Sequence, residues 1–383
     1  MKNDVSLINY LTPIRFGYGA LEVLPEECRR LNIRRPLLVT DPGVRAAGLL
    51  DRLLAVVAEL AEPAVFADTP ANPTEQAVRR ATATFKEGKC DGIIALGGGS
   101  SIDLAKGVSI AATHAGPLQS FAAIENGASR ITAAVSPVIA IPTTAGTGSE
   151  VGRAAVVILD DGRKVGLISP HVIPKSAICD PDLTLGLPAP LTAGSGMDAI
   201  AHCMETFMSP AFNPPADAIA LDGLRRGWAY IERATHAPQD REARLNMMSA
   251  SLQGALAFQK GLGCVHSLSH ALGGLDPRLH HGTLNAIFLP AVIEFNRGTA
   301  SMREQACLAR MAQAMSLDDP DKIPAAVREM NRRIGLPNGL ASLDVARTSF
   351  PDIVSRALAD HCHKTNPRIA TESDYRMLLE ASL

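Results

Sequence analysis

The apolar pattern of the sequence changes near residue 186, and this change constrains the possible folds more than any other feature. Before it lie five short apolar or β-branched runs, at 35–41, 63–68, 91–99, 137–144 and 176–181. Amphipathic segments such as residues 75–89 separate these runs. Because strands that alternate with helices are typical of parallel βαβ units, this half predicts an α/β domain with a parallel sheet.

The second half shows hardly any strand-like alternation. Its Ala-, Leu- and Met-rich segments lie at 197–208, 214–235, 241–260, 283–297, 301–316, 321–334 and 351–360. Such segments predict helices. The Pro- and Gly-rich join "LGLPAPLTAGSG" separates the halves, so we expect a nucleotide-binding α/β domain at 1–185 and an all-helical domain at 186–383. We expect the active site in a cleft between them.

The bulk composition argues against several classes of function. The chain of 383 residues has a formal net charge of −2, which gives no basic patch for nucleic acid or anionic membranes. No apolar run approaches the roughly 18 residues of a membrane span, and the N-terminus has no signal-peptide pattern. The seven cysteines form no C-x-x-C pair, which is typical of reduced thiols. We therefore expect a cytoplasmic protein without disulfides that binds small molecules.

Two glycine-rich loops follow predicted strands, "ALGGGSSIDLAKG" at 95–107 and "IPTTAGTGSE" at 141–150. In the first, backbone N–H groups and a helix N-terminus can bind a phosphate, although the spacing matches neither the Rossmann nor the P-loop pattern. A tight strand-to-helix turn explains it equally well. The second combines glycines with hydroxyls, which can surround a nucleotide or form a polar turn. Two such loops on consecutive strands together favour a dinucleotide.

Asp41 ends the first of the strand-like runs. A carboxylate in this position can accept hydrogen bonds from the ribose 2′-hydroxyl of NAD and repels the 2′-phosphate of NADP. The alternative interpretation is a turn residue in an Asp-Pro pair. The position therefore favours NAD over NADP without excluding a structural role.

Acidic and imidazole side chains recur at helical spacing in the second half. Asp198 and His202 are four residues apart on an apolar helix, and so are His266 and His270. His280 and His281 precede the next apolar segment. One carboxylate and three imidazoles complete a four-ligand set for a divalent metal ion, with positions left for substrate. An Asp–His hydrogen bond without metal explains the first pair equally well.

These motifs together resemble the iron-containing (group III) alcohol dehydrogenase family. The resemblance rests, in order, on GGGSSIDLAKG, IPTTAGTGSE, DPDLTLGLP, GMDAIAHCMETF, GLGCVHSLSHALGG and HHGTLNAIFLP, and it covers almost the whole chain. It implies an α/β NAD(P)-binding domain followed by an all-α metal-binding domain. It also implies a homodimer or a larger homo-oligomer.

The resemblance implies a role for particular residues. The metal ligands are expected to be Asp198, His202, His266 and His281, because His281 precedes the family pattern Gly-x-x-Asn-Ala. His270 is expected to be the catalytic group near substrate and cofactor, as a proton relay. The expected cofactor contacts are Asp41, Asn72, Gly97, Gly98, Gly99, Ser100, Ser101, Asp103, Thr143, Thr144, Thr147, Ser149, Lys164 and Leu183.

The substrate pocket is expected to include Phe258, Leu262 and Cys362, although each is also an ordinary core residue type. Arg153 is a candidate to bind a carboxylate if the enzyme takes hydroxy acids; the alternative is a surface ion pair.

The expected reaction is reversible hydride transfer between an alcohol and NAD, with the metal as Lewis acid. The family name favours Fe²⁺, while the ligand types suit Zn²⁺ equally. A metal-independent enzyme similar to maleylacetate reductase, or a lyase similar to dehydroquinate synthase, are the alternatives.

Overall fold

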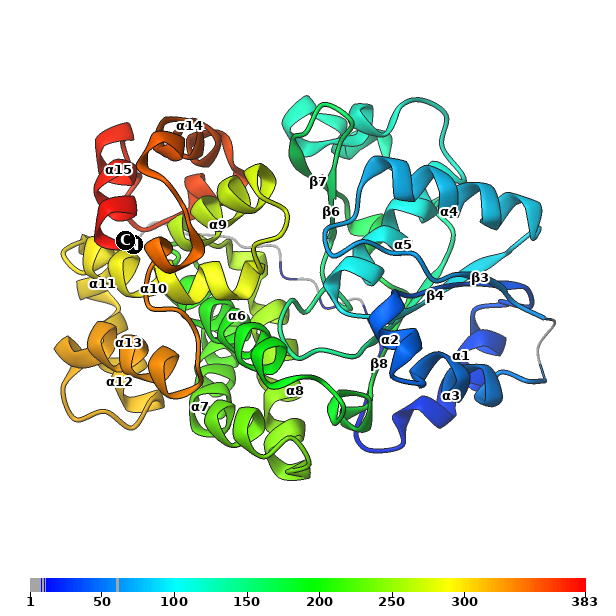
Figure 1. Cartoon of the computed structure of the whole chain (residues 1–383), viewed down its shortest axis with the longest axis horizontal. Coiled ribbons are helices and arrows are strands. Elements are labelled where there is room, and N and C mark those ends of the chain that lie inside the picture. The colour runs from blue at the N-terminus through cyan, green and yellow to red at the C-terminus, as the bar shows by residue number, and fades with distance from the viewer. Residues whose placement is uncertain (1–7, 9, 11, 60–61) are drawn as a thin grey trace. The chain divides into compact units, whose positions relative to one another are not determined.

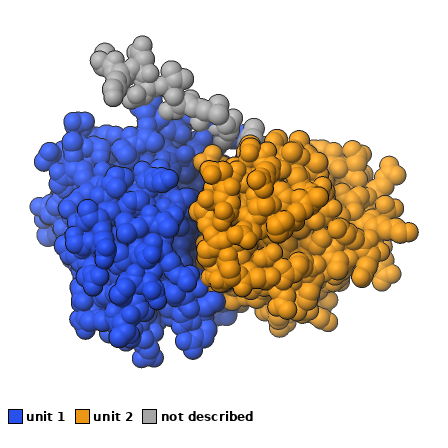
Figure 2. Space-filling model, turned by 90° about the horizontal axis from the view of Figure 1, so that it is seen from above, with its two compact units in different colours: residues 1–10, 145–147, 187–383 blue, residues 11–144, 148–186 orange. Residues whose placement is uncertain are grey.

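The computed structural model of the protein describes residues 8, 10, 12–59 and 62–383. The chain divides into two compact units, which Figure 2 shows in different colours. The first, here called the sheet unit, comprises residues 11–144 and 148–186. The second, here called the helical unit, comprises residues 1–10, 145–147 and 187–383. The second glycine-rich loop therefore contributes residues to both units.

A six-stranded parallel sheet forms the centre of the sheet unit, with the strand order β1-β8-β5-β4-β2-β3 (Figure 1). Its strands are β1 (Ile14–Phe16), β2 (Pro36–Val39), β3 (Ala64–Phe66), β4 (Gly92–Gly97), β5 (Val138–Pro142) and β8 (Ser176–Cys179). Gly97 of β4 pairs with Pro142 of β5, so both glycine-rich loops leave the sheet at adjacent strand ends. The expected parallel sheet is confirmed.

Helices cover both faces of this sheet. They are α1 (Leu24–Arg30), α2 (Pro42–Ala46), α3 (Leu49–Val56), α4 (Glu75–Glu87) and α5 (Gly99–Ala111). Along β4, Ile93 joins an apolar cluster with residues of α4 and α5, whereas Ile94 joins a second cluster with residues of α1 and α3. Both faces are therefore buried, which explains why the strands appear in the sequence as continuous apolar runs.

The expectation of five strands was incomplete. Strand β1 has only three residues, too few to show a period in the sequence. The antiparallel pair β6 (Ala154–Ile158) and β7 (Lys164–Ile168) was also missed. The turn between these strands contains Asp161-Gly162. An Asp-Gly pair between two runs of alternating polarity is a strong sequence signal for a β-hairpin, and the prediction of parallel βαβ units overlooked it.

The described residues of the helical unit form no β-strand, as expected for an all-helical domain. Its helices are α6 (Ala189–Met208), α7 (Pro214–His236), α8 (Arg241–Ala257), α9 (Cys264–Leu275), α10 (His281–Asn296), α11 (Ala300–Glu304), α12 (Cys307–Ala314), α13 (Ile323–Arg333), α14 (Phe350–Ala359) and α15 (Glu372–Ala381). Short 3-10 helices η7 (Phe258–Lys260) and η11 (His361–Thr365) follow α8 and α14. None of the described helices is long and apolar enough to cross a membrane.

Two of the expected helical segments differ most from the structure. Helix α6 begins eight residues before the expected start at 197, within the Pro- and Gly-rich join. The expected helix at 301–316 is two helices, because Ala306 adopts a left-handed conformation (φ 51°) between α11 and α12.

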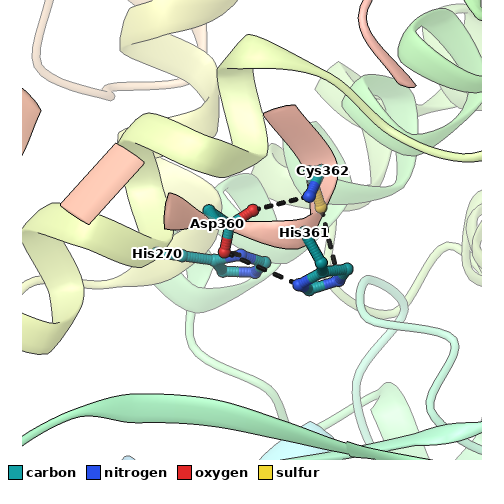
Figure 3. Close-up of side chains that lie close together, drawn as sticks. All are labelled: His270, Asp360, His361 and Cys362. Atoms are coloured by element: carbon teal, nitrogen blue, oxygen red, sulfur yellow. Dashed lines mark hydrogen bonds and ion pairs between the residues drawn. The ribbon is translucent and has the colours of Figure 1, made fainter. Parts of the chain in front are cut away.

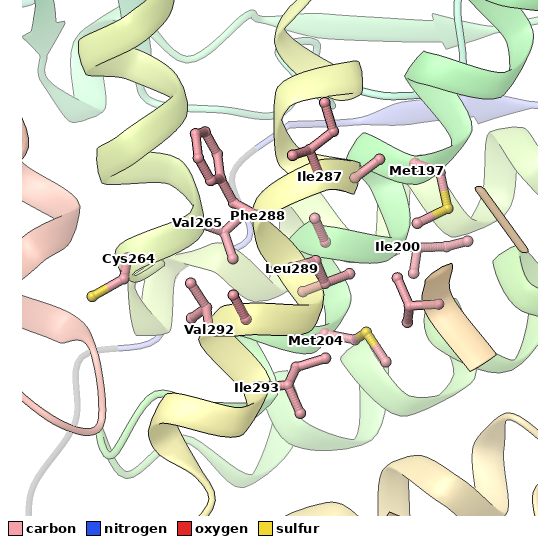
Figure 4. Close-up of a cluster of buried hydrophobic side chains, with 14 of the residues drawn as sticks. Met197, Ile200, Met204, Cys264, Val265, Ile287, Phe288, Leu289, Val292 and Ile293 are labelled. Carbon is pink, nitrogen blue, oxygen red and sulfur yellow. The ribbon is translucent and has the colours of Figure 1, made fainter. Parts of the chain in front are cut away.

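The core of the helical unit lies between α6, α9 and α10 (Figure 4). Nearly the whole surface of α6 from Thr192 to Met208 is buried, as is most of α10. The drawn side chains that carry this packing include Met197, Ile200, Met204, Cys264, Val265, Ile287, Phe288, Leu289, Val292 and Ile293. Polar groups on these three helices consequently lie in an apolar interior, where they need partners.

Candidate functional site

Backbone contact between α6 and α10 brings the first candidate ligands together. A Cβ atom at Gly282 would lie 2.1 Å from the carbonyl oxygen of Gly194, so only glycine permits this approach. Gly282 follows His281, the first residue of α10, and Gly194 lies one turn before Asp198 on α6. The glycine of the His-Gly pair therefore brings His281 close to Asp198.

Asp198 is at the centre of a group of three imidazoles. Its Oδ1 atom lies 3.8 Å from Nε2 of His202, 3.7 Å from Nε2 of His266 and 3.7 Å from Nε2 of His281. These separations are too long for hydrogen bonds. Ligand bonds of about 2.1 Å would separate the donors of a tetrahedral ion by roughly 3.4 Å. The donor atoms of Asp198, His202 and His266 all lie within 4.8 Å of one another, and His281 is linked to them by its distance to Asp198. The distances from Asp198 are thus close to those between the ligands of a divalent metal ion.

The site is buried on three sides. The side chains of Asp198, His202 and His266 are 2%, 6% and 1% exposed, whereas that of His281 is 25% exposed. An ion held by the four donors would therefore be accessible only on the side of His281. This matches the chemistry of a catalytic site, which leaves a position for substrate.

The charges in this group shift each other's pKa. Burial raises the pKa of Asp198, but His202, His281 and His266 outweigh burial and hold that pKa well below its usual range. Burial lowers the pKa of His202 to about 4. The carboxylate is therefore ionised and His202 is neutral at pH 7, and both are the forms that bind metal.

Glu205, which the sequence analysis missed, orients His266. It is buried on α6, and its Oε2 accepts a hydrogen bond of 2.5 Å from Nδ1 of His266. Its Oε1 accepts one of 2.8 Å from the backbone of Val265. Burial lowers the pKa of His266, but Asp198 and Glu205 outweigh it and raise that pKa to about 9. Without an ion this ring is therefore protonated at pH 7, and a metal ion at Nε2 would displace that proton. The spacing of seven residues from Asp198 to Glu205 places both side chains on one helix face. This spacing could have identified Glu205 from the sequence.

The glycine-rich loop at 141–150 supports a second histidine. Gly146, in the part of the loop that belongs to the helical unit, accepts a hydrogen bond of 3.3 Å from Nδ1 of His202. A Cβ atom at Gly146 would lie 2.8 Å from the carbonyl oxygen of Ser195, so the loop needs glycine here. Fixing one ring nitrogen of His202 in this way leaves Nε2 directed at Asp198.

Asn285, also missed, contacts three of the four candidate ligands. It is fully buried one turn after His281 on α10. Its amide nitrogen donates to Asp198 Oδ1 at 2.8 Å and lies 3.2 Å from Nε2 of His266 and 3.1 Å from Nε2 of His281. This amide therefore holds the carboxylate of Asp198, and its nitrogen lies beside the two Nε2 atoms whose lone pairs a metal ion would take.

His270 lies beside this group and is paired with an acid from a distant segment (Figure 3). Its Nδ1 is 3.0 Å from Oδ2 of Asp360, the residue before η11. Its ring stacks on that of His281, with a centroid distance of 5.2 Å and an interplanar angle of 11°. Burial raises the pKa of Asp360, but His270 and His361 outweigh burial and hold that pKa well below its usual range. Pairing at Nδ1 fixes the ring and directs Nε2 away from Asp360.

His361 and Cys362 complete a second cluster of possible metal donors with His270 and Asp360. Within it, Nδ1 of His361 is 3.6 Å from Asp360 Oδ2, and its Nε2 is 3.5 Å from Cys362 Sγ. The two nitrogens thus face different partners. Burial also raises the pKa of the Cys362 thiol well above its usual value. These contacts indicate a hydrogen-bonded group and not a second metal cage.

His280 has a different environment from His281. Its side chain caps α10, where Nδ1 accepts a hydrogen bond of 3.3 Å from the backbone of Thr283. The structure thus places His281, and not His280, beside Asp198.

The residues expected to line the substrate pocket lie in both units. The ring of Phe258 lies 5.4 Å from that of His202, and Cys362 belongs to the cluster with His270. The carbonyl group of Leu262 accepts a hydrogen bond from Thr365. All three belong to the helical unit, whereas Arg153 is an exposed residue of the sheet unit.

Several expected cofactor residues meet where β2 and β4 end. Asp41 caps α2 by accepting a hydrogen bond from the Val44 backbone, and its Oδ2 accepts another, of 3.2 Å, from Ser101. Gly97 has a φ of 156°, and a Cβ there would lie 2.5 Å from the Ser101 hydroxyl. Asp41 is thus both a turn residue and a carboxylate at the carboxyl edge of the sheet, where nucleotides bind in such folds.

Other expected cofactor residues lie at the same edge. Thr143 donates its backbone N–H to Gly97, and Thr144 lies against Gly98. Gly99 is the first residue of α5, and the Ser100 hydroxyl donates to the carbonyl of Ala71. The neighbouring Asn72 accepts a hydrogen bond of 3.0 Å from Lys164.

Asp103 and Ser149 instead belong to a buried polar group around Lys106, which the sequence analysis also missed. The ammonium group of Lys106 donates to Ser149 Oγ and to the carbonyls of Gly152 and Ala154 at 2.7–2.9 Å. Asp103 accepts from Ser149 and from the backbone of Val156. This group joins α5 to the second glycine-rich loop and to β6.

The last two expected cofactor residues are Leu183 and Thr147. Leu183 is 2% exposed in the apolar core of the sheet unit, and Thr147 belongs to the helical unit.

Known proteins resemble this chain along nearly its whole length. The family model described as "Iron-containing alcohol dehydrogenase" matches residues 12–181, and the model of the C-terminal part of that family matches 192–383. The 4-hydroxybutyrate dehydrogenase of Cupriavidus necator is 59% identical over 383 residues, which cover 99% of this chain and 100% of the relative. The 1,3-propanediol dehydrogenase of Klebsiella pneumoniae is 37% identical over 380 residues, which cover 96% and 97%.

A solved structure agrees with these relatives. A crystal structure of a 1,3-propanediol oxidoreductase matches this structure with a TM-score of 0.92 and 35% sequence identity, covering 99% of this chain and 100% of the other. The family models cover both halves of the chain, and the relatives cover almost all of it. The chain therefore belongs to the iron-containing alcohol dehydrogenase family and is an oxidoreductase that uses an NAD-type cofactor and acts on small-molecule alcohols.

Proposed function

We propose that the protein interconverts 4-hydroxybutyrate and its aldehyde with NAD, using Fe²⁺ held by Asp198, His202, His266 and His281. The observation that carries the substrate assignment is the 59% identity, over the full length, to a 4-hydroxybutyrate dehydrogenase. The convergence of four donor atoms around one point supports the metal ligands. The family description favours iron, and metal analysis of purified protein distinguishes it from zinc.

NAD is proposed over NADP because of Asp41. Its carboxylate at the end of β2 can accept hydrogen bonds from ribose hydroxyls and would repel a 2′-phosphate. The hydrogen bonds from Val44 and Ser101 hold this carboxylate at the edge where both glycine-rich loops begin. These loops offer backbone N–H groups and the N-terminus of α5 to a diphosphate.

The side chains of the helical unit then have separate tasks. A divalent ion at the four ligands supplies Lewis-acid chemistry, which lowers the pKa of an alcohol. Glu205, Gly146 and Asn285 keep the ligand side chains oriented, so little reorganisation is needed. NAD, held at the glycine-rich loops, would supply the hydride acceptor.

The proton of the alcohol also needs an acceptor. His270, fixed by Asp360 at Nδ1 and packed on the ring of His281, is placed to receive it at Nε2. The ion pair with Asp360 stabilises the imidazolium that would form, as in other acid–histidine pairs.

A substrate comparison tests the proposal. Iron-loaded protein with NAD is assayed with 4-hydroxybutyrate, 1,4-butanediol, 1,3-propanediol and 1-butanol while the absorbance of NADH is recorded. We expect kcat/KM for 4-hydroxybutyrate to exceed that for 1-butanol by at least about tenfold, since one charge-assisted contact contributes that much. Turnover of the diols without measurable activity on 4-hydroxybutyrate would refute the substrate assignment and leave the family assignment intact.

A further inference from the structure

Three imidazole rings are stacked in a row that leads away from the candidate metal ligands. The ring of His281 packs on that of His270 at a centroid distance of 5.2 Å, and His270 packs on His361 at 5.7 Å with an interplanar angle of 20°. Side-chain exposure along the row is 25%, 15% and 42%. Figure 3 shows His270 and His361 side by side. His361 is therefore the outer and most accessible member of the row.

The position of His361 is fixed from two sides. Its ring stacks on His270, and its Nδ1 lies 3.6 Å from Oδ2 of Asp360. Asp360 is itself held, because its Oδ1 accepts a hydrogen bond of 2.8 Å from the backbone of Cys362. A side chain already held in one orientation loses little entropy when it binds a ligand.

We propose that the imidazole of His361 binds the carboxylate of a four-carbon ω-hydroxy acid whose hydroxyl group lies at the metal ligands. The inference rests on the function proposed above and specifies which residue selects for an acid over a neutral alcohol. Nδ1 of His361 faces Asp360, and its Nε2 lies 3.5 Å from Cys362 Sγ, which is a weak hydrogen-bond partner. A substrate carboxylate would take the place of the sulfur at Nε2, where an N–H donor suits it better.

The length of the substrate fits the row of rings. Extended 4-hydroxybutyrate spans about 6 Å from hydroxyl oxygen to carboxylate oxygen, given C–C bonds of about 1.5 Å. A bond of about 2 Å to a metal ion and a hydrogen bond of about 2.8 Å lengthen this to roughly 11 Å. The two ring-to-ring distances of 5.2 and 5.7 Å place the ring of His361 at most about 11 Å from that of His281, so a substrate of this length is long enough to reach it.

Other cationic side chains near this segment have different surroundings. Nδ1 of His363 lies 3.0 Å from the hydroxyl group of Tyr375. Lys260 is buried and forms an ion pair of 2.5 Å with Asp217. Lys364 is exposed on η11 and provides a control, as a neighbouring cation for which no stacking on His270 is seen. Arg153, suggested by the sequence, lies in the sheet unit and is the competing candidate.

The test compares an acid and a neutral alcohol of equal length. His361→Val removes the donor, His361→Gln retains one, Lys364→Gln is the matched control, and Arg153→Ala tests the competing residue. Each variant is assayed with 4-hydroxybutyrate and 1,4-butanediol after its metal content and melting temperature are shown to equal those of the wild type. We expect His361→Val to raise KM for 4-hydroxybutyrate about tenfold or more, with kcat and both butanediol parameters nearly unchanged. His361→Gln should recover part of this loss.

A binding measurement gives a second readout that does not depend on turnover. Calorimetric titration of metal-loaded protein with butyrate should show about tenfold weaker binding in His361→Val than in wild type, and no change in Lys364→Gln. Equal losses on both substrates, or an effect confined to Lys364→Gln or Arg153→Ala, would overturn the role of His361. Wild-type protein that does not prefer 4-hydroxybutyrate to 1-butanol would instead refute the proposed function, and this inference with it.

Discussion

His280 and His281 are adjacent in the chain, yet their surroundings suit different tasks. The ring of His281 points at Asp198 and packs on His270, whereas that of His280 caps the backbone of α10. The difference arises because the first residue of a helix and its N-cap project in different directions. Neighbouring residues of the same type can thus have unrelated functions at a helix start.

Single substitutions at this pair should therefore have unequal effects. His281→Ala removes one of four proposed ligands, so we expect the bound metal to fall from about one ion per chain to a small fraction of that. His280→Ala should retain the metal and lower the free energy of unfolding by about 1 kcal/mol, the usual effect of losing a helix cap. Elemental analysis after dialysis against a weak chelator measures the first effect, and urea unfolding the second. Similar metal loss in both variants would contradict the assignment of His281.

The supporting residues show what sequence reasoning reaches and where it stops. Asp198, His202, His266 and His281 stand in recognisable motifs, and Glu205 was within reach because it lies seven residues after Asp198 on the same helix. Asp360 could not be identified from the sequence, because 90 residues separate it from His270 and only the packing of η11 against α9 brings the two together. Local periodicity therefore identifies ligands on one helix and not partners that tertiary structure supplies.

At the scale of elements, the predicted positions of strands and helices agree best with the structure where hydrophobic burial alone determines the element. Strands β2, β3, β4, β5 and β8 fall within the expected runs, and all of them except the edge strand β3 are buried along their whole length. Helix α6 was placed too short because Gly194 and Gly196 suggest a linker. In the structure a Cβ at Gly196 would lie 2.9 Å from side chains of α7 and α8, so these glycines serve close helix packing. Tertiary contact outweighs the low helix propensity of glycine there.

The same reasoning predicts the effect of a methyl group between α6 and α10. Gly282→Ala places a Cβ against the backbone of Gly194, which cannot move independently of its helix. We expect a loss of about 2–3 kcal/mol in the free energy of unfolding, together with weaker metal binding, because Asp198 and His281 are forced apart. Gly298→Ala, at the other end of α10, meets no atom within 4 Å and is the control. Urea unfolding and metal titration of both variants give the answer, and unchanged metal affinity in Gly282→Ala would contradict the proposed role of this contact.

At the scale of the whole molecule, all four proposed metal ligands belong to the helical unit, and the glycine-rich strand ends belong to the sheet unit. Metal binding should accordingly stabilise one unit in particular. At a metal concentration a hundred times the Kd, a site present only in the folded state gains about 2.7 kcal/mol. Backbone amides of α6, α9 and α10 that exchange through opening of the site should therefore exchange up to about a hundredfold more slowly with the metal ion than without it.

Hydrogen exchange with and without a chelator measures this, and the amides of β4 and β5 serve as the internal reference. Equal protection in both units would contradict a metal site confined to the helical unit. The prediction depends only on which residues hold the ion and not on its identity.

The uneven exposure of the four ligands has a consequence for how long such an enzyme stays active. Asp198, His202 and His266 are almost completely enclosed, whereas His281 is a quarter exposed and is the first residue of its helix. Helix ends open more readily than helix interiors. An ion would consequently leave on the side of His281, because the packed residues that follow it on α10 and the other three ligands enclose the remaining sides. The working lifetime of the enzyme would then depend on how firmly His281 is held against Asp198.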